Sequence, residues 1–183
     1  MRSLTMVGVE VVLLADYWLP DRSGRTHIGR LVHRAKDRDD PEAATELADR
    51  FAGLAEALAE TPDGSGRLVV PVPPTLPAAD TAGGLLVDLL ARSLAGAGAG
   101  EYRGDLVVRT AVAPRLRHVD PQRRAETAAA AGYRASDGAA GRHVVVVDDV
   151  ILTGTTVSAV AACLRDAGAA TVTAAVAART RLR

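Results

Sequence analysis

Apolar residues recur along the chain in two patterns that alternate with each other, short continuous runs and stripes at helical spacing. Val7 to Leu14 and Leu68 to Val72 are short runs rich in β-branched residues, which predicts strands. Between them, the Asp40-Pro41 dipeptide starts a predicted helix, because aspartate caps a helix and proline suits its first position. The apolar stripe of that helix follows the i, i+4, i+7, i+11 spacing and consists of Leu47, Phe51, Leu54 and Leu58.

The same alternation continues to the end of the chain. Further helices are expected at His27 to Lys36, Leu85 to Leu94 and Thr156 to Ala167. Further strands are expected at Leu106 to Arg109, His143 to Val147 and Thr171 to Ala178. Asp120-Pro121 repeats the aspartate–proline helix start, and Gly132 would close that helix. Strands that alternate with helices predict an α/β fold, a mainly parallel sheet flanked by helices, in a single domain over residues 1–183.

Composition narrows the class of protein. Hydrophobic residues make up 48% of the chain and aromatic residues 3%, so alanine, valine and leucine must fill the core. The formal net charge is zero, which argues against nonspecific nucleic-acid binding, because that affinity comes from neutralising phosphates. Every basic residue except Lys36 is arginine, a side chain suited to bidentate contact with phosphate. Cys163 is the only cysteine, so an intrachain disulfide is impossible and a cysteine-based zinc site is not expected.

The N-terminal apolar stretch, Met1 to Ala15, is interrupted by Glu10, and no small-residue cleavage pattern follows it. This favours a core strand over a signal peptide. No stretch reaches the ~20 apolar residues that a membrane helix needs. We therefore expect a cytoplasmic protein without a membrane segment.

The segment with the clearest chemistry runs from Val144 to Thr156. Four consecutive valines predict a strand buried on both faces, and two acids, Asp148 and Asp149, follow at its carboxyl end, where open α/β sheets bind ligands. A glycine then lets the backbone approach a ligand closely, and a helix start supplies free N–H groups that hold an anion. The turn into that helix consists of Val150, Leu152, Thr153, Gly154, Thr155 and Thr156. A ligand whose phosphate binds in the turn and whose hydroxyl groups bind to the two acids would be a ribose 5-phosphate.

The acid pair and the glycine tract each have an alternative interpretation. The acids could be solvated residues at a strand end followed by an ordinary helix cap. An ATP-hydrolysing site would need a G-x-x-x-x-G-K-[ST] loop, and the only lysine, Lys36, has no glycine before it. The glycine tract from Gly96 to Gly100 follows a helix rather than a strand, so we interpret it as a flexible connection and not as a dinucleotide-binding motif.

The Asp148-Asp149 pair followed by Thr153-Gly154-Thr155-Thr156 resembles the 5-phosphoribosyl pyrophosphate (PRPP) motif of type I phosphoribosyltransferases. The wider layout resembles the ComF-like, amidophosphoribosyltransferase-like branch. Three further segments support that branch, and they are Ile28 to Lys36, Pro71-Val72-Pro73, and Arg109 to Tyr133.

This resemblance implies a role for each matching position. Asp148 and Asp149 would bind the ribose hydroxyls, and the Thr153 to Thr156 turn would hold the 5-phosphate. Pro73, Pro74 and Thr75 would lie beside the pyrophosphate. Arg115 and Arg117, on the loop between Arg109 and Arg124, would neutralise it. The resemblance also implies magnesium held mainly by PRPP, with no direct protein ligand, and a small hood formed by parts of Met1 to Asp40 and Pro73 to Gly83.

The chain departs from the family pattern at several positions, which leaves the function open between two classes. The R-G-F-N stretch of the family reads Ala82-Gly83-Gly84-Leu85 here, its later glutamine is replaced near Arg117, and the N-terminal cysteine-rich ribbon is missing. The first class is an enzyme that transfers phosphoribosyl groups from PRPP to an unidentified small-molecule acceptor. The second is a non-catalytic PRPP- or nucleotide-binding module linked to DNA uptake or regulation. A homodimer is the default expectation for either class.

Five side chains have both a functional and a structural interpretation. His118 is either an acid–base group or a surface histidine, and Arg115 and Arg117 could belong to a merely solvated basic loop. Lys36 has a family counterpart but could also be an ordinary charge at a helix end. Cys163 falls inside the helix that follows the phosphate turn, where packing is favoured over reactivity.

Overall fold

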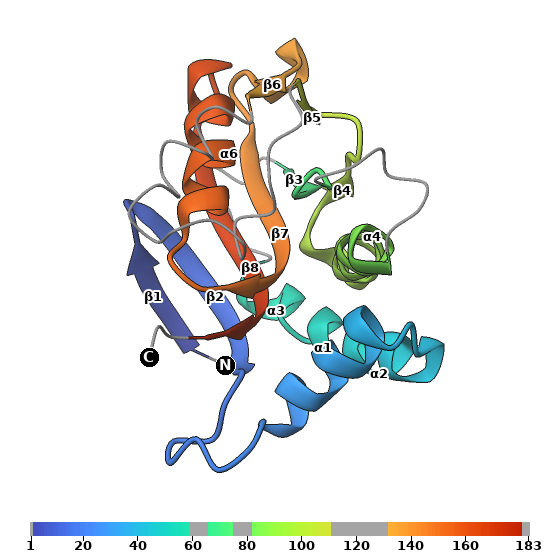
Figure 1. Ribbon diagram of the computed structural model, residues 1–183. Coiled ribbons are helices and arrows are strands. Elements are labelled where there is room, and N and C mark those ends of the chain that lie inside the picture. The colour runs from blue at the N-terminus through green and yellow to red at the C-terminus, as the bar shows by residue number, and fades with distance from the viewer. Residues whose placement is uncertain (1, 59–65, 75–81, 111–131, 181–183) are drawn as a thin grey trace.

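The computed structural model describes residues 2–58, 66–74, 82–110 and 132–180. A six-stranded sheet in the order β1-β2-β8-β7-β3-β4 forms the centre of this part of the chain (Figure 1). Its strands are β1 (Arg2–Met6), β2 (Val9–Asp16), β3 (Arg67–Pro71), β4 (Glu101–Tyr102), β7 (His143–Ile151) and β8 (Thr171–Arg179). Every neighbouring pair except β1–β2 is parallel, which confirms the predicted mainly parallel α/β sheet.

Helices cover both faces of the sheet (Figure 1). One face packs against α1 (His27–Asp37), α2 (Pro41–Ala52), α3 (Ala55–Leu58) and α4 (Ala82–Leu94), and the other packs against α6 (Thr155–Asp166). The valines of β7 divide between these layers, since Val145 and Val147 belong to the first core and Val144 and Val146 to the second. The prediction of a strand buried on both faces is therefore confirmed.

Side chains cap α1 and α2, and the cap at Asp40 was predicted. Thr26 precedes α1, and its hydroxyl accepts a hydrogen bond from the Gly29 amide at 3.0 Å. Asp40 precedes α2 and accepts hydrogen bonds from the amides of Glu42 and Ala43, both at 3.1 Å. The single helix expected through Leu58 is instead two, because α2 ends at Ala52 and α3 begins at Ala55 after a short turn.

The N-terminal run is a hairpin and not the single strand that was predicted from Val7. Val7 and Gly8 form its two-residue turn with φ values of 50° and 73°, a geometry that matches the right-handed twist of the flanking strands. Val7 is consequently 62% exposed and does not belong to the core. The strand itself, β2, begins at Val9 and pairs with both β1 and β8.

One other predicted element differs from the structure. The strand at Leu106 to Arg109 is β5 (Val107–Arg109), which pairs antiparallel with β6 (Tyr133–Ala135) in a separate two-stranded sheet. The glycine tract after α4 is a turn, Ala95–Ala99, in which Gly98 is left-handed with a φ of 96°, and it connects α4 to β4 as expected. The helix expected from Asp120 lies outside the described residues.

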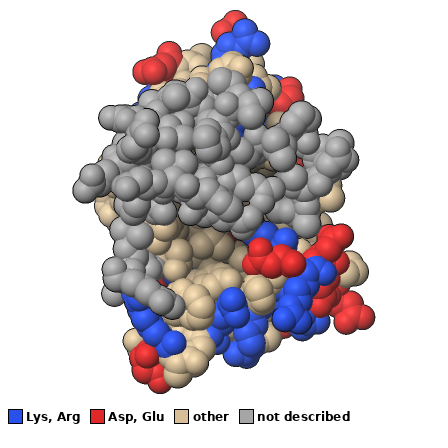
Figure 2. Space-filling model, viewed as in Figure 1, with Lys and Arg blue, Asp and Glu red and all other residues tan. Residues whose placement is uncertain are grey.

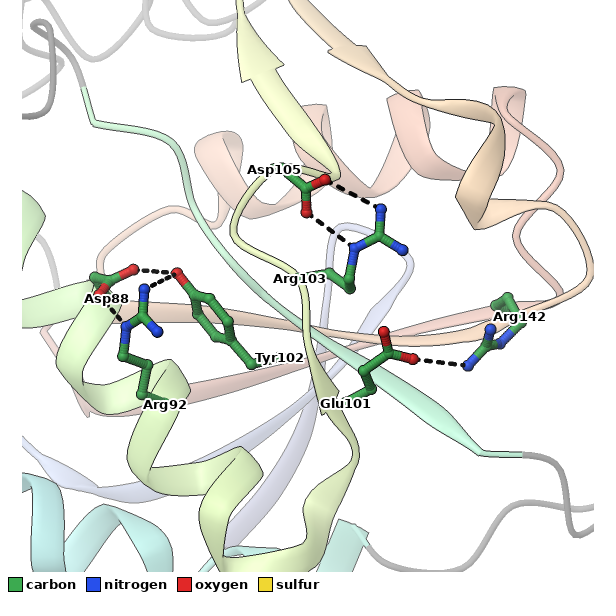
Figure 3. A network of polar contacts seen from close by, with 7 residues as sticks. All are labelled: Asp88, Arg92, Glu101, Tyr102, Arg103, Asp105 and Arg142. Atoms are coloured by element: carbon green, nitrogen blue, oxygen red, sulfur yellow. Dashed lines mark hydrogen bonds and ion pairs between the residues drawn. The ribbon is translucent and has the colours of Figure 1, made fainter.

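A surface network of charged side chains fastens β4 to its neighbours (Figure 3). Tyr102 donates a hydrogen bond to Asp88 of α4, and Arg92 of α4 contacts Asp88 at 2.7 Å and lies over the Tyr102 ring. Arg103 pairs with Asp105 at 2.9 Å in the same network. Among the described residues, no helix has both the length and the apolar character needed to span a membrane.

Candidate functional site

The predicted site residues meet at the carboxyl edge of the parallel strands. Pro71, the last residue of β3, lies opposite Val147 of β7, and the Val72 amide donates to the Val147 carbonyl at 2.9 Å. Pro73 and Pro74 therefore leave the sheet beside the acid pair. In parallel α/β sheets, ligands bind outside this edge.

Asp148 and Asp149 are the last charged residues of β7, which continues two residues further than the acids, to Ile151. Each carboxylate accepts a hydrogen bond from the following backbone amide, Asp148 from Asp149 at 2.9 Å and Asp149 from Val150 at 2.6 Å. These bonds fix one oxygen of each acid. Asp149 is only 3% exposed, whereas Asp148 is half-buried.

Lys36, a residue of α1, forms an ion pair with Asp149 of β7. Its ammonium group, in the last turn of α1, contacts Oδ2 of Asp149. Burial alone would lower the pKa of Lys36, but the carboxylates of Asp149 and Asp148 outweigh burial, and the pKa is raised. Lys36 is therefore a permanent cation that faces two acids.

The two carboxylates have different electrostatic environments. Burial and the nearby charge of Asp149 raise the pKa of Asp148 to about 7, although Lys36 acts in the opposite direction. The site thus contains one carboxylate tied to a cation and a second whose charge changes near neutral pH.

The turn after β7 has the shape expected of an anion-binding loop. Gly154 has a φ of 79°, a left-handed conformation that glycine adopts without steric cost, and α6 begins at Thr155. The hydroxyl groups of Thr153 and Thr155 lie 2.7 Å apart, and Gly154 offers no side chain to cap the helix. The amides of the first helical turn and the two hydroxyls can therefore be offered to an anion.

The turn of the β1–β2 hairpin packs against Gly154. A methyl group placed on Gly154 would lie 3.3 Å from Cγ2 of Val7 and 3.5 Å from Cβ of Met6. The hairpin therefore limits the side chain that can stand at this position. It also explains how an exposed residue such as Val7 contributes to the site.

Arg109 and Tyr133 form a second polar group in the vicinity of Asp148. Nη2 of Arg109 donates to the Tyr133 hydroxyl at 3.0 Å, and its guanidinium lies 5.3 Å from the centre of the Tyr133 ring. Burial and the charge of Asp148 raise the pKa of Tyr133, while Arg109 lowers it. Nε and Nη1 of Arg109 are buried and have no hydrogen-bond partner within the described part of the chain.

A further cluster occupies the carboxyl end of β2, two strands from the acid pair. Asp16 accepts hydrogen bonds from Arg179 of β8 at 3.0 and 2.8 Å. Arg25 lies 5.7 Å from the ring of Tyr17 and 5.1 Å from that of Trp18, and it donates to the Tyr17 hydroxyl at 3.2 Å. This edge of the sheet therefore carries aromatic surface as well as charge.

The space-filling view shows a hollow in the lower half of the molecule (Figure 2). In that view it coincides with the lower ends of β7 and β8 and with the neighbourhood of α1 in Figure 1. Uncharged residues line it, and acidic and basic residues stand side by side along its rim. Within the described residues, no group of three or more His, Cys, Asp or Glu side chains is placed to hold a metal ion.

Most of the candidate binding residues are therefore brought together. The set at this edge consists of Pro73, Pro74, Asp148, Asp149, Val150, Leu152, Thr153, Gly154, Thr155 and Thr156. Thr75, Arg115, Arg117 and His118 lie outside the described residues, so their roles remain predictions. Cys163 is a half-buried residue of α6, and burial raises its thiol pKa, which does not favour a reactive thiolate.

Sequence reasoning missed Tyr133 and left Lys36 undecided. No motif marks Tyr133, because its contact with Arg109 depends on the pairing of β5 with β6. Lys36 did carry a signal, since it is the only lysine in a chain whose other basic residues are arginines.

This layout, a parallel sheet with an acid pair and a glycine turn at its carboxyl edge, is typical of α/β proteins that bind a ligand at that edge. The chain belongs to the phosphoribosyl transferase domain family, whose model matches residues 45–182. Among curated proteins, none matches the sequence.

One similar solved structure is that of the allosteric regulatory enzyme of purine biosynthesis. It shares 23% sequence identity with a TM-score of 0.48, and the match covers 73% of this chain and 26% of that one. The present chain thus matches about a quarter of the length of that enzyme.

Proposed function

We propose that this protein transfers the 5-phosphoribosyl group of PRPP to a small-molecule nucleophile and releases pyrophosphate. The observation that supports this most is the placement of Asp148 and the Gly154 turn at one end of β7, in a chain of the phosphoribosyl transferase domain family. A sugar phosphate presents a diol and a phosphate at its two ends, and the site presents acceptors and donors in the same order.

The substrate would lie along the carboxyl edge of the sheet. Its 5-phosphate would accept hydrogen bonds from the amides and hydroxyls of the turn at residues 153–156. The ribose hydroxyls would donate to the acid pair. The pyrophosphate would lie toward the end of β3, at Pro73, Pro74 and Thr75, with the guanidinium groups of Arg115 and Arg117 neutralising its charge.

Magnesium fits this arrangement as a partner of the substrate. Two carboxylates, one of them already paired with Lys36, are too few oxygen ligands to hold the ion alone. When bound through PRPP, magnesium would neutralise charge on the departing pyrophosphate. The described residues supply the remaining work, which is to orient the sugar and to stabilise the charge that develops on it.

Bond breaking at C1 leaves an oxocarbenium-like, positively charged sugar. A carboxylate beside the ribose stabilises that charge more strongly in the transition state than in the ground state, which is the requirement for catalysis. Fixed orientation of the ring by the phosphate turn would supply the rest.

The acceptor would approach from the side opposite to the pyrophosphate. Because the pyrophosphate would lie toward β3, the opposite side is that of β8 and β2, where Tyr17, Trp18 and Arg25 stand. These residues belong to the segment from which the resemblance predicts a hood. We accordingly propose that the segment from Met1 to Asp40 contributes the acceptor contacts, that the protein is of the ComF-like branch, and that it acts in the cytoplasm as a homodimer.

The test is an assay of pyrophosphate release from PRPP with magnesium and a panel of nitrogen nucleophiles, paired with calorimetry of PRPP binding. Release that requires one acceptor supports the transferase. Release without any acceptor identifies PRPP hydrolysis instead. Absence of magnesium-dependent PRPP binding would contradict the proposal altogether.

A second candidate function is a PRPP- or nucleotide-binding module without catalysis. The sequence Ala82-Gly83-Gly84-Leu85, which stands where the family pattern has R-G-F-N, favours it. In the same experiment, PRPP binding without release under every acceptor condition would support the module.

A further inference from the structure

The turn of the β1–β2 hairpin contains a residue that does not suit its backbone. Val7 has a φ of 50° and Gly8 a φ of 73°, and the first position of such a two-residue turn is normally asparagine, aspartate or glycine. A β-branched residue at positive φ is an outlier that persists only where the surrounding structure holds it. Val7 is also 62% exposed, so burial in the core does not explain why valine stands there.

The side chain of Val7 packs on the glycine of the phosphate turn. A methyl group placed on Gly154 would lie 3.3 Å from Cγ2 of Val7 and 3.5 Å from Cβ of Met6, so the tip of the hairpin covers one side of this glycine. The contact joins residues that are far apart in the sequence, because the hairpin lies beside the start of α6 (Figure 1). The exposed valine is therefore placed against the one residue of the turn that has no side chain.

A hydrogen bond from α6 holds the tip of the hairpin in place. Nη2 of Arg165, in the last turn of α6, donates to the carbonyl of Gly8 at 3.0 Å. Because α6 begins at Thr155, directly after Gly154, the hairpin is fastened to the same helix whose first amides belong to the phosphate turn. The tip is thus a fixed support for that turn.

Gly154 needs a support because a glycine does not select its own conformation. Its φ of 79° is only one of the values that glycine adopts without steric cost, and negative values are as accessible. In another conformation its carbonyl would move, and that carbonyl accepts the Ser158 amide at 2.8 Å at the start of α6. The amides of the first helical turn would then no longer converge on one anion. A stiff β-branched side chain packed on the glycine restricts this movement.

We propose that Val7 is a positioning residue that holds Gly154 in its left-handed conformation and so preorganises the phosphate turn. Asparagine or glycine would fit the hairpin turn better, but neither has a stiff apolar side chain to pack on Gly154. The strained backbone at Val7 is retained for this contact. The consequence for phosphate binding rests on the proposed function, whereas the conformational role of Val7 rests on the packing alone.

The first experiment compares Val7→Asn with the wild type by amide hydrogen exchange of the full chain without any ligand. Asn-Gly is a favoured sequence for this turn, so the folding equilibrium constant should rise by roughly fivefold. Greater stability slows the exchange of protected amides, as Ala161, a buried residue further along α6, should show. The Ser158 amide should instead exchange roughly fivefold faster, because its hydrogen bond to Gly154 opens more often. A purely structural role of Val7 would change both amides in the same direction.

The second experiment measures ribose 5-phosphate binding by calorimetry. Val7→Asn should bind roughly fivefold more weakly than the wild type although it is the more stable protein, because the turn is no longer preorganised. Val7→Ile keeps the β-branched side chain and should restore both the wild-type affinity and the wild-type exchange of Ser158. Gly141→Ala is the matched control for stability, since it strains a backbone with a φ of 68° where the new methyl group meets no atom within 4 Å. It should unfold more easily and still bind like the wild type.

Three results would overturn the inference. The first is a Ser158 amide that exchanges in Val7→Asn at the wild-type rate or more slowly. The second is a Val7→Ile variant whose Ser158 amide exchanges as fast as that of Val7→Asn. The third is equal affinity of the wild type and Val7→Asn for ribose 5-phosphate when the wild type binds it.

The two experiments separate this inference from the proposed function. Hydrogen exchange needs neither PRPP nor turnover, so the Ser158 amide decides the role of Val7 even if the wild type binds no sugar phosphate. Conversely, PRPP binding by the wild type together with unchanged Ser158 exchange in Val7→Asn would retain the proposed function and reject the role of Val7.

Discussion

Two clusters of charged side chains lie at different edges of the fold, and they are built on opposite principles. In the cluster around β4, three acids face three arginines, most partners are close in sequence, and every member is exposed or half-buried (Figure 3). In the cluster around the end of β7, two acids face a single lysine from a distant helix, and Asp149 is almost fully buried. The first cluster is electrically satisfied and the second is not.

The difference indicates what each cluster is for. Exposed pairs such as Arg103–Asp105 contribute little to stability and need no ligand. Burial of an extra carboxylate is unfavourable unless something binds to it, and Asp148 is half-buried with its pKa raised. An unbalanced charge kept at the carboxyl edge of a parallel sheet is what a binding site requires before its ligand arrives.

The largest expected effect is the loss of Asp148 compared with the loss of a balanced acid. Asp148→Asn should lower both PRPP affinity and the rate of pyrophosphate release by tenfold or more, about 1.4 kcal/mol at least, because an amide accepts the hydroxyls less strongly and carries no charge. Asp105→Asn is the matched control and should change neither quantity. Equal effects of the two substitutions would show that the contrast between the clusters has no functional meaning.

The next effect concerns pH. Because the pKa of Asp148 is raised to about 7, the ionised fraction should rise from about one tenth at pH 6 to about nine tenths at pH 8, and ribose 5-phosphate affinity should rise roughly tenfold with it. The raised pKa of Asp148 also makes the stability of the folded protein depend on pH, but stability falls as the pH rises. The folded protein holds this proton more tightly than the unfolded chain does, so the contribution of Asp148 to stability falls as the pH rises from about 4 to about 7.

Calorimetry at the two pH values checks the affinity, and Asp148→Asn serves as its reference. The ligand phosphate itself titrates near pH 6, and the variant retains that part of the pH dependence only. A pH dependence that is identical in the wild type and in Asp148→Asn would assign it to the ligand and contradict the prediction.

A smaller effect is expected at the phosphate turn. Gly154→Ala forces a left-handed backbone on alanine, which costs roughly 1 kcal/mol, and places a methyl group 3.3 Å from Val7. Gly141→Ala imposes a similar strain at a φ of 68° with no atom within 4 Å of the new methyl group. Both variants should lose similar stability in urea unfolding. Only Gly154→Ala should also bind ribose 5-phosphate more weakly, by roughly fivefold or about 1 kcal/mol.

The sequence was informative where structure is local and less so where it is not. The valine run and the glycine turn predicted β7 and the start of α6 because both depend on neighbouring residues. The turn at Val7 and Gly8 was missed because valine seldom adopts a positive φ, so the residue was counted as part of a strand.

The candidate site likewise has a part that could be predicted from the sequence and a part that could not. The acids and the phosphate turn are contiguous, so their chemistry could be read from one segment. Lys36 reaches Asp149 only after α1 has packed on the sheet, and Arg109 reaches Tyr133 only after β5 has paired with β6. No spacing along the chain encodes those contacts, because they depend on how separate elements pack and pair.

The smallest expected effect comes from the balanced cluster itself. Tyr102 donates to Asp88 and accepts from Arg92 at 3.2 Å, and burial together with the Asp88 bond raises its pKa to about 12. Tyr102→Phe removes one hydroxyl but leaves the ring beneath Arg92 and the Asp88–Arg92 pair at 2.7 Å in place. The free energy of unfolding should therefore fall by only about 0.5–1.5 kcal/mol, with ribose 5-phosphate affinity unchanged. Urea unfolding and calorimetry measure the two quantities on the same sample, and a fall in affinity would show that the β4 edge is coupled to the site at β7.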